Sequence, residues 1–71
     1  MNEDIAQQIY IFIRAYIEER GHSPSQREIA KGCYVALGTV SKHLSILQAR
    51  GLIDYETRHP RSISLSKQLQ D

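Results

Sequence analysis

The sequence predicts a mainly α-helical α+β fold, a single three-helix winged helix-turn-helix domain that spans residues 1–71. Two helical segments are separated by a short turn, an amphipathic helix precedes them, and a pair of strand-like segments follows them. A chain of this length buries only about 60% of the surface of its unfolded form, which is enough for one small core. We therefore expect three helices and a two-stranded β-hairpin wing to share that core.

The first predicted helix runs from about residue 4 to residue 20. Its apolar residues recur at the spacings of one helical face. Gly21 follows directly and is expected to end the helix in a left-handed conformation. We interpret this helix as the scaffold on which the rest of the domain packs. Its apolar face consists of Ile5, Ile9, Phe12, Ile13, Tyr16 and Ile17.

The second predicted helix covers about residues 25–32. Ser25 and Glu28 have the spacing of a capping box, in which each side chain accepts a hydrogen bond from the other residue's backbone amide. The helix is expected to end near Gly32, where the chain turns. Backbone amides and the helix dipole also make the start of this helix a candidate phosphate contact, to which we assign Ser25 and Arg27.

The third predicted helix covers about residues 36–50, with Gly51 as its stop. Its outward positions are small, polar or basic. A helix that is anchored on one side and carries short polar groups on the other suits insertion into the major groove of DNA. The expected buried stripe is Leu37, Val40, Leu44 and Leu47. The predicted DNA contacts on this helix are Ala36, Leu37, Gly38, Thr39, Ser41, Lys42 and Ser45.

A β-hairpin wing is predicted over about residues 52–65. The second of its two strand-like segments alternates polar and apolar side chains with the period of a strand. The basic segment between the strands contains a proline and forms the predicted tip, where Arg58, His59 and Arg61 are expected to contact DNA. The polar tail at residues 66–71 is expected to fray.

The net charge of +1 hides an uneven distribution. Residues 1–20 contain two basic and four acidic side chains, whereas residues 21–50 contain four basic side chains and one acidic side chain. The positive excess therefore coincides with the predicted helix-turn-helix. Nucleic-acid binding depends on where the positive charge lies more than on the total, so this distribution favours double-stranded DNA as the partner.

The remaining reactive side chains predict no catalytic, metal or cofactor site. His22, His43 and His59 are 21 and 16 residues apart, which matches no metal-ligand spacing. Cys33 is the only cysteine and is expected to be a small buried hydrophobe at the helix corner. A nucleophile needs a positioned base and a pocket, for which so small an interior has little room. We therefore expect no enzyme.

The start of the chain has neither a basic region nor a long apolar run, so the sequence predicts neither a signal peptide nor a membrane span. A single thiol also fits a reducing compartment. We therefore expect a cytoplasmic protein that makes no contact with a membrane.

Residues 24–30 read Pro-Ser-x-x-Glu-Ile-Ala, a fairly specific pattern, and three further segments accompany it: His43-Leu44, Gly51–Asp54 and Arg61–Leu65. Together these segments resemble the N-terminal DNA-binding domain of the LexA repressor family. The resemblance extends from the first helix to the second strand. It implies a winged helix that binds DNA with sequence specificity, as a transcriptional repressor or as the DNA-binding head of one.

The sequence departs from this family in two respects. LexA-type domains read their operator with a serine, an asparagine and acidic residues on the third helix, whereas the matching positions here hold Ala36, Gly38, Ser41 and Lys42, and the turn is one residue shorter. We therefore do not expect the operator of LexA to apply. LexA also continues into a self-cleaving domain with a Ser/Lys dyad, which these residues cannot host, so the resemblance implies a standalone small regulator or the head of a truncated one.

The alternative interpretation is a winged helix that serves as a protein-protein interaction module, because fold alone does not decide function. A protein-docking face carries large apolar or aromatic anchors. Among the outward positions of the helix-turn-helix, Tyr34 alone has this character. We also expect a monomer in solution, because the core uses the hydrophobic positions, with two copies on a palindromic DNA site.

Overall fold

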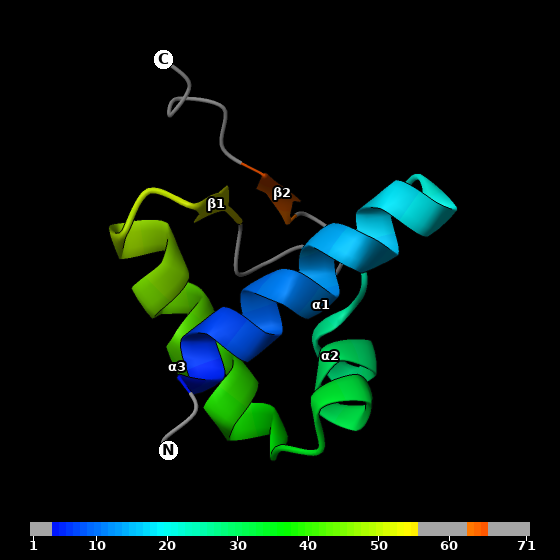
Figure 1. The fold of residues 1–71 in the computed structure, drawn as a ribbon. Coiled ribbons are helices and arrows are strands. Elements are labelled where there is room, and N and C mark those ends of the chain that lie inside the picture. Colours follow the sequence, from blue (N-terminus) through cyan, green and yellow to red (C-terminus); the bar gives the residue numbers. More distant parts are fainter. Residues whose placement is uncertain (1–3, 56–62, 66–71) are drawn as a thin grey trace.

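The computed structural model describes residues 4–55 and 63–65. Three helices are followed by two short strands that pair antiparallel, with Ile53 opposite Leu65 and Asp54 opposite Ser64 (Figure 1). This arrangement confirms the predicted winged helix-turn-helix. The elements are α1 (Ile5–Arg20), α2 (Gln26–Cys33), α3 (Leu37–Ala49), β1 (Ile53–Asp54) and β2 (Ser64–Leu65).

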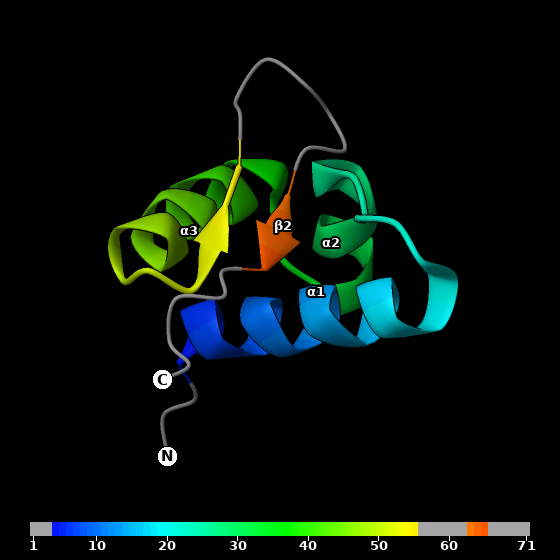
Figure 2. The same cartoon turned by 90° about the horizontal axis from the view of Figure 1, so that it is seen from above.

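The core takes residues from every helix and from the strand region. Seen from above, α1 runs along one side, α2 and α3 lie along the other, and the strands lie over the space between them (Figure 2). The predicted tip of the wing and the tail at residues 66–71 lie outside the described residues. In the described ranges, the buried hydrophobic residues are Ala6, Ile9, Ile13, Ile29, Val40, Leu44, Leu47, Ile53 and Ile63.

Helix α1 is capped at both ends by the local sequence. Asp4 precedes the helix, and its Oδ1 accepts a hydrogen bond of 3.1 Å from the amide of Ala6. Gly21 adopts the predicted left-handed conformation, with φ of 80°, and its amide donates to the carbonyl of Ile17 over 2.8 Å. Helix α1 therefore starts one residue after the predicted start, because Asp4 acts as the cap and not as the first helical residue.

The predicted capping box is present at the start of α2. The Glu28 amide donates to Ser25 Oγ over 3.2 Å, and the Ser25 amide donates to Glu28 Oε1 over 2.8 Å. The helix ends at Cys33, one residue past the predicted end near Gly32, and its C-cap is Tyr34, which is left-handed with φ of 59°. No local pattern indicates a tyrosine in this conformation, which normally favours glycine.

Gly32 has a packing role instead of a chain-ending role. A Cβ atom at this position would overlap the ring of Phe12 on α1. The absence of a side chain thus lets α2 approach α1 closely, and this contact fixes the position of the helix-turn-helix on its scaffold helix.

Helix α3 begins after Ala36, whose carbonyl accepts from the amide of Val40 over 3.1 Å. At its other end, Gly51 is left-handed with φ of 79°, and its amide donates to the carbonyl of Gln48 over 3.0 Å. The amide of Leu52 donates to the carbonyl of Leu47 over 3.0 Å. These two bonds form a Schellman motif, which turns the chain directly into β1.

The buried stripe of α3 consists of Val40, Leu44 and Leu47. Leu37 was predicted to join it, but 44% of its surface is exposed. Leu37 is the first residue of the helix, next to the turn, and it borders a hollow between α2 and α3 instead of the core.

Candidate nucleic-acid interface

The outward face of α3 is formed by Gly38, Lys42, Ser45 and Ala49, which are spaced at four, three and four residues and are all exposed. This spacing puts them on the side of the helix opposite to Val40 and its buried neighbours. Two of the four residues have at most a methyl side chain. Another surface can therefore approach the helix backbone closely.

Thr39 and Ser41 lie at the two edges of this face and are half-buried. His43 Nδ1 is 2.8 Å from the carbonyl oxygen of Thr39. A carbonyl oxygen can only accept, so Nδ1 carries the proton in this contact. The predicted contacts at Thr39 and Ser41 can thus reach a groove only from the edges of the helix, whereas Ala36 and Leu37 are exposed at its start.

A shallow hollow lies between α2 and the start of α3. Arg27 and Lys31, one helical turn apart on α2, supply its positive charge, and Glu28 contributes an acidic group. The positive residues are both exposed. The full lining is Ser25, Arg27, Glu28, Ala30, Lys31 and Leu37.

The start of α2, which was predicted to contact phosphate, is already occupied by the carboxylate of Glu28. Two of the amides there are used in the capping box, and the Glu28 carboxylate occupies the positive end of the helix dipole. The amides of Gln26 and Arg27 lie in the same first turn, and the Arg27 side chain is exposed. Tyr16 on α1 also donates to Glu28 Oε1 over 3.2 Å, a contact between helices that sequence spacing did not indicate.

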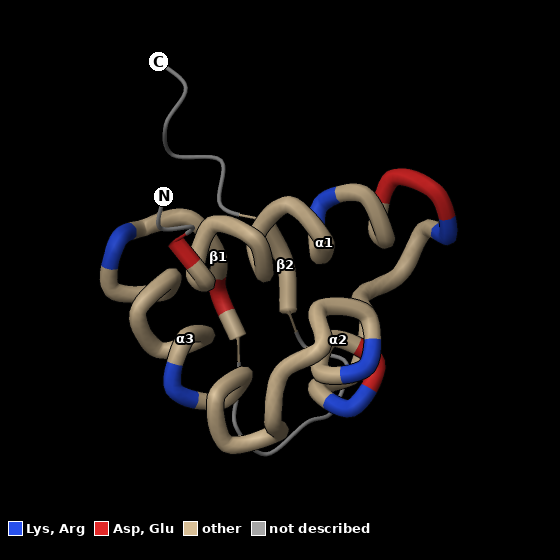
Figure 3. Tube along the Cα trace, turned by 60° about the horizontal axis from the view of Figure 1, so that its bottom comes forward, with Lys and Arg blue, Asp and Glu red and all other residues tan. Residues whose placement is uncertain are grey.

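Charge is distributed in the structure as the sequence suggested. Figure 3 shows blue positions along α2 and α3 and red positions at the C-terminal end of α1. Glu18 and Glu19 belong to the last turn of that helix. Arg50 extends this positive series, but its guanidinium lies 3.4 Å from Asp4 Oδ2 and ties the end of α3 to the start of α1. Arg27, Lys31 and Lys42 are therefore the described cations best placed to meet an anionic partner.

A second hollow extends the outward face of α3 toward the wing. It is lined by Ser45, Gln48, Ala49 and Tyr55. Gln48 is exposed, and Tyr55 is half-buried just after β1. Of these four residues only Ser45 is a predicted DNA contact, because the helical pattern does not show which residues of the wing lie beside α3.

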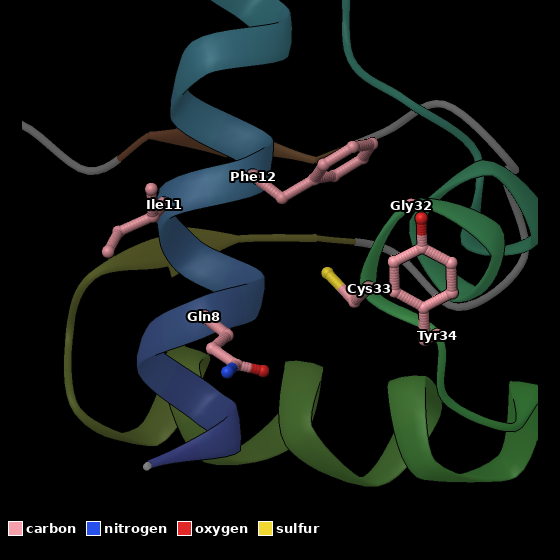
Figure 4. A pocket seen from close by; sticks show the side chains of 6 residues that line it. All are labelled: Gln8, Ile11, Phe12, Gly32, Cys33 and Tyr34. Atoms are coloured by element: carbon pink, nitrogen blue, oxygen red, sulfur yellow. The ribbon is translucent and has the colours of Figure 1, made fainter.

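Two of the exposed large apolar residues, Ile11 and Tyr34, line a hollow between α1 and α2 (Figure 4). Ile11 is 56% exposed and Tyr34 is 92% exposed. The ring of Phe12 points toward α2, and the sulfur of Cys33 points toward α1 (Figure 4). Cys33 is half-buried, and this burial raises the pKa of its thiol above the ordinary value. Of the three exposed large hydrophobic residues in the described ranges, Ile11 and Tyr34 thus lie away from the outward face of α3, and Leu37 lies at the start of that helix.

Among the described residues, no group of three or more His, Cys, Asp or Glu side chains could hold a metal ion. Each helix in the same ranges is too short or too polar to cross a membrane. The three predicted contacts at the wing tip, Arg58, His59 and Arg61, lie outside the described residues.

A family model and the similar proteins of known identity all point to the same family. The family model described as the LexA DNA binding domain matches residues 4–62. The LexA repressors of Clostridium novyi and Clostridium acetobutylicum are each 41% identical over 68 residues, which cover 94% of this chain and 33% of the repressor. The LexA repressor of Thermotoga maritima is 32% identical over 63 residues, which cover 89% of this chain and 32% of the repressor. The chain thus spans about a third of the length of these relatives.

Proposed function

From the premise that this chain belongs to the LexA DNA-binding domain family, we propose that it binds double-stranded DNA with sequence specificity and represses transcription. The observation that carries the proposal is the outward face of α3. This helix is anchored by Val40, Leu44 and Leu47 and presents small, polar and basic side chains to solvent. The part of LexA that the chain matches is the DNA-binding domain, so we assign no catalytic step to these residues.

In this proposal α3 enters the major groove, and its outward face lies against the base edges. Lys42 can donate to guanine O6 and N7, and Ser41 can donate or accept at the edge of the helix. Leu37, which is 44% exposed, can contact a thymine methyl group. Gly38 lets the helix backbone approach the groove, because the space beside its Cα is open. These residues would carry the sequence preference.

Phosphate contacts would hold the helix in place without reading sequence. The proposed contacts are Arg27 and the backbone amides at the start of α2, with Ser25 at the cap. Ser45, further along α3, would contact the sugar-phosphate backbone at the edge of the same groove. The wing tip, with Arg58, His59 and Arg61, would contact adjacent phosphates or the minor groove mainly through its charge.

The test is selection of binding sites from random duplex DNA. We expect a defined motif that this chain binds more tightly than a scrambled duplex of the same composition. The motif should differ from the operator of LexA, because Ala36, Gly38, Ser41 and Lys42 replace the residues that read it. A palindromic motif would support two copies on one site.

Failure to enrich any motif, combined with no binding to duplex DNA at low salt, would contradict the proposal. The protein-protein interaction module would then be the better explanation. In that case the hollow between α1 and α2, with Ile11 and Tyr34 at its rim, would be the face to test.

A further inference from the structure

Tyr16 reaches from the scaffold helix α1 to the start of α2. Its hydroxyl donates to Glu28 Oε1 over 3.2 Å. Its ring contacts three neighbours: the Phe12 ring at 5.9 Å between centroids, the His22 ring at 5.6 Å, and the Arg20 guanidinium at 4.8 Å from the ring centroid. These contacts hold the ring in one place, so the hydroxyl is a fixed donor for the Glu28 carboxylate.

The same carboxylate oxygen accepts from the Ser25 amide over 2.8 Å. Glu28 borders the hollow between α2 and α3, together with Arg27 and Lys31. A negative charge therefore lies next to Arg27, which is proposed to meet a DNA phosphate, and next to Lys31, an exposed cation that lines the same hollow. Its position matters, because a carboxylate that turned toward the hollow would attract these cations and repel the phosphate.

Glutamate at the third position of a helix has other rotamers available, and a pair such as Glu28 and Lys31 is spaced for contact along the helix surface. Hydrogen bonds to an ionised acceptor are stronger than those between neutral groups. A second donor on the carboxylate therefore favours the rotamer of the capping box over those that point into the hollow.

We propose that Tyr16 is a positioning residue for DNA binding, whose hydroxyl keeps the Glu28 carboxylate in the capping box and away from Arg27 and Lys31. This inference rests on the proposed function, since it concerns phosphate contacts at the start of α2. It adds a residue of the scaffold helix to the determinants of affinity, although that residue does not itself touch DNA.

The test begins with Tyr16→Phe, which removes the hydroxyl and keeps the ring contacts. Affinity is measured by fluorescence anisotropy against the selected duplex and a scrambled duplex, at several salt concentrations. We expect affinity for both duplexes to fall by about two- to fivefold at low salt, the range of an exposed charge interaction. The loss should disappear at high salt, because salt screens the repulsion. Tyr10→Phe makes the same chemical change elsewhere on α1 and should leave affinity unchanged.

A double-mutant cycle with Glu28→Gln separates positioning from folding. The glutamine side chain can still accept from the Ser25 amide, but it carries no charge. We therefore expect Tyr16→Phe to have no effect on DNA affinity in the Glu28→Gln background. An equal loss in both backgrounds, or a loss that salt does not change, would show a purely structural role and overturn the inference. If the wild-type chain itself binds no duplex, the proposed function fails, and this inference fails with it.

Discussion

Lys42 is the exposed basic side chain at the middle of the outward face of α3, which makes it the clearest test of sequence reading. Lys42→Ala should change the preferred base at one position by about 1–3 kcal/mol. Arg61→Ala should instead weaken binding to all sequences and reduce the slope of log affinity against log salt by about one unit. Titrations of each variant against the selected and the scrambled duplex distinguish the two effects. An equal loss on both duplexes for Lys42→Ala would make it a phosphate contact and leave the reading to Thr39 and Ser41.

Tyr34 adopts a left-handed conformation with almost its whole side chain in solvent. For a residue with a Cβ atom this conformation costs about 1–2 kcal/mol, whereas glycine adopts it freely and loses about 0.5–1 kcal/mol in chain entropy. Tyr34→Gly should therefore raise the free energy of unfolding by about 0.5–1 kcal/mol. Urea unfolding measures the change. Tyr34→Ala is the matched control, because it removes the ring but keeps the strain, and a similar gain in that variant would refute the explanation.

Cys33 is half-buried, and desolvation raises the pKa of its thiol. Because the thiolate is the reactive form, iodoacetamide should alkylate the folded chain more slowly than the urea-unfolded chain at neutral pH.

The same shift in pKa makes stability depend on pH. As pH rises, the Cys33 thiol of the unfolded chain loses its proton before the thiol of the folded chain does. Stability from the neutral thiol is thus complete below the unfolded pKa and is lost as pH rises through the folded pKa. Cys33→Ala should flatten this alkaline decline in urea midpoint, and an unchanged decline would assign it to other groups.

At the scale of elements, two glycines in helices have opposite roles. A Cβ atom at Gly32 would overlap the Phe12 ring, whereas nothing lies within 4 Å of one at Gly38. Gly32→Ala should lower the free energy of unfolding by about 1 kcal/mol, because the cost of overpacking exceeds the gain in helix propensity. Gly38→Ala should raise it by up to about 1 kcal/mol and weaken DNA binding. Thermal unfolding of both variants tests the pair, and stabilisation by Gly32→Ala would show that the Phe12 ring moves aside without loss.

The sequence predicted the order and type of the elements because each helix carries its own start and stop signals. Asp4, Ser25 and Glu28 act at helix starts, and Gly21 and Gly51 act at helix ends. Errors arose where a residue's neighbours come from another helix. The contact between Gly32 and the Phe12 ring, for example, is invisible along the chain.

The candidate site was less predictable than the fold for the same reason. Periodicity placed Lys42 and Ser45 on the outward face, but it also placed Leu37 in the core, since it does not show where the packing partners of α3 end. The bond from Tyr16 to Glu28 joins residues twelve positions apart on different helices, and no local pattern indicates it.

For the whole molecule, we expect a monomer in solution that binds one half-site weakly. The core uses most of the large hydrophobic side chains in the described ranges, and those left exposed are Ile11, Tyr34 and Leu37. Sedimentation at micromolar concentration without DNA should give the mass of a single chain. A tight dimer would mean that the hollow between α1 and α2 is an interface, and Ile11→Lys would then dissociate it.

Ile63, the residue before β2, is buried, as are residues near the start of the chain. It joins a core that already contains Ala6 and Ile9 from the first turns of α1. Because the chain emerges from the ribosome N-terminus first, α1, α2 and α3 emerge before Ile63, the last residue of their shared core. The nascent helix-turn-helix must wait, with part of its apolar surface exposed, until Ile63 has emerged. The nascent chain is prone to aggregate during the interval between the emergence of α3 and the emergence of Ile63.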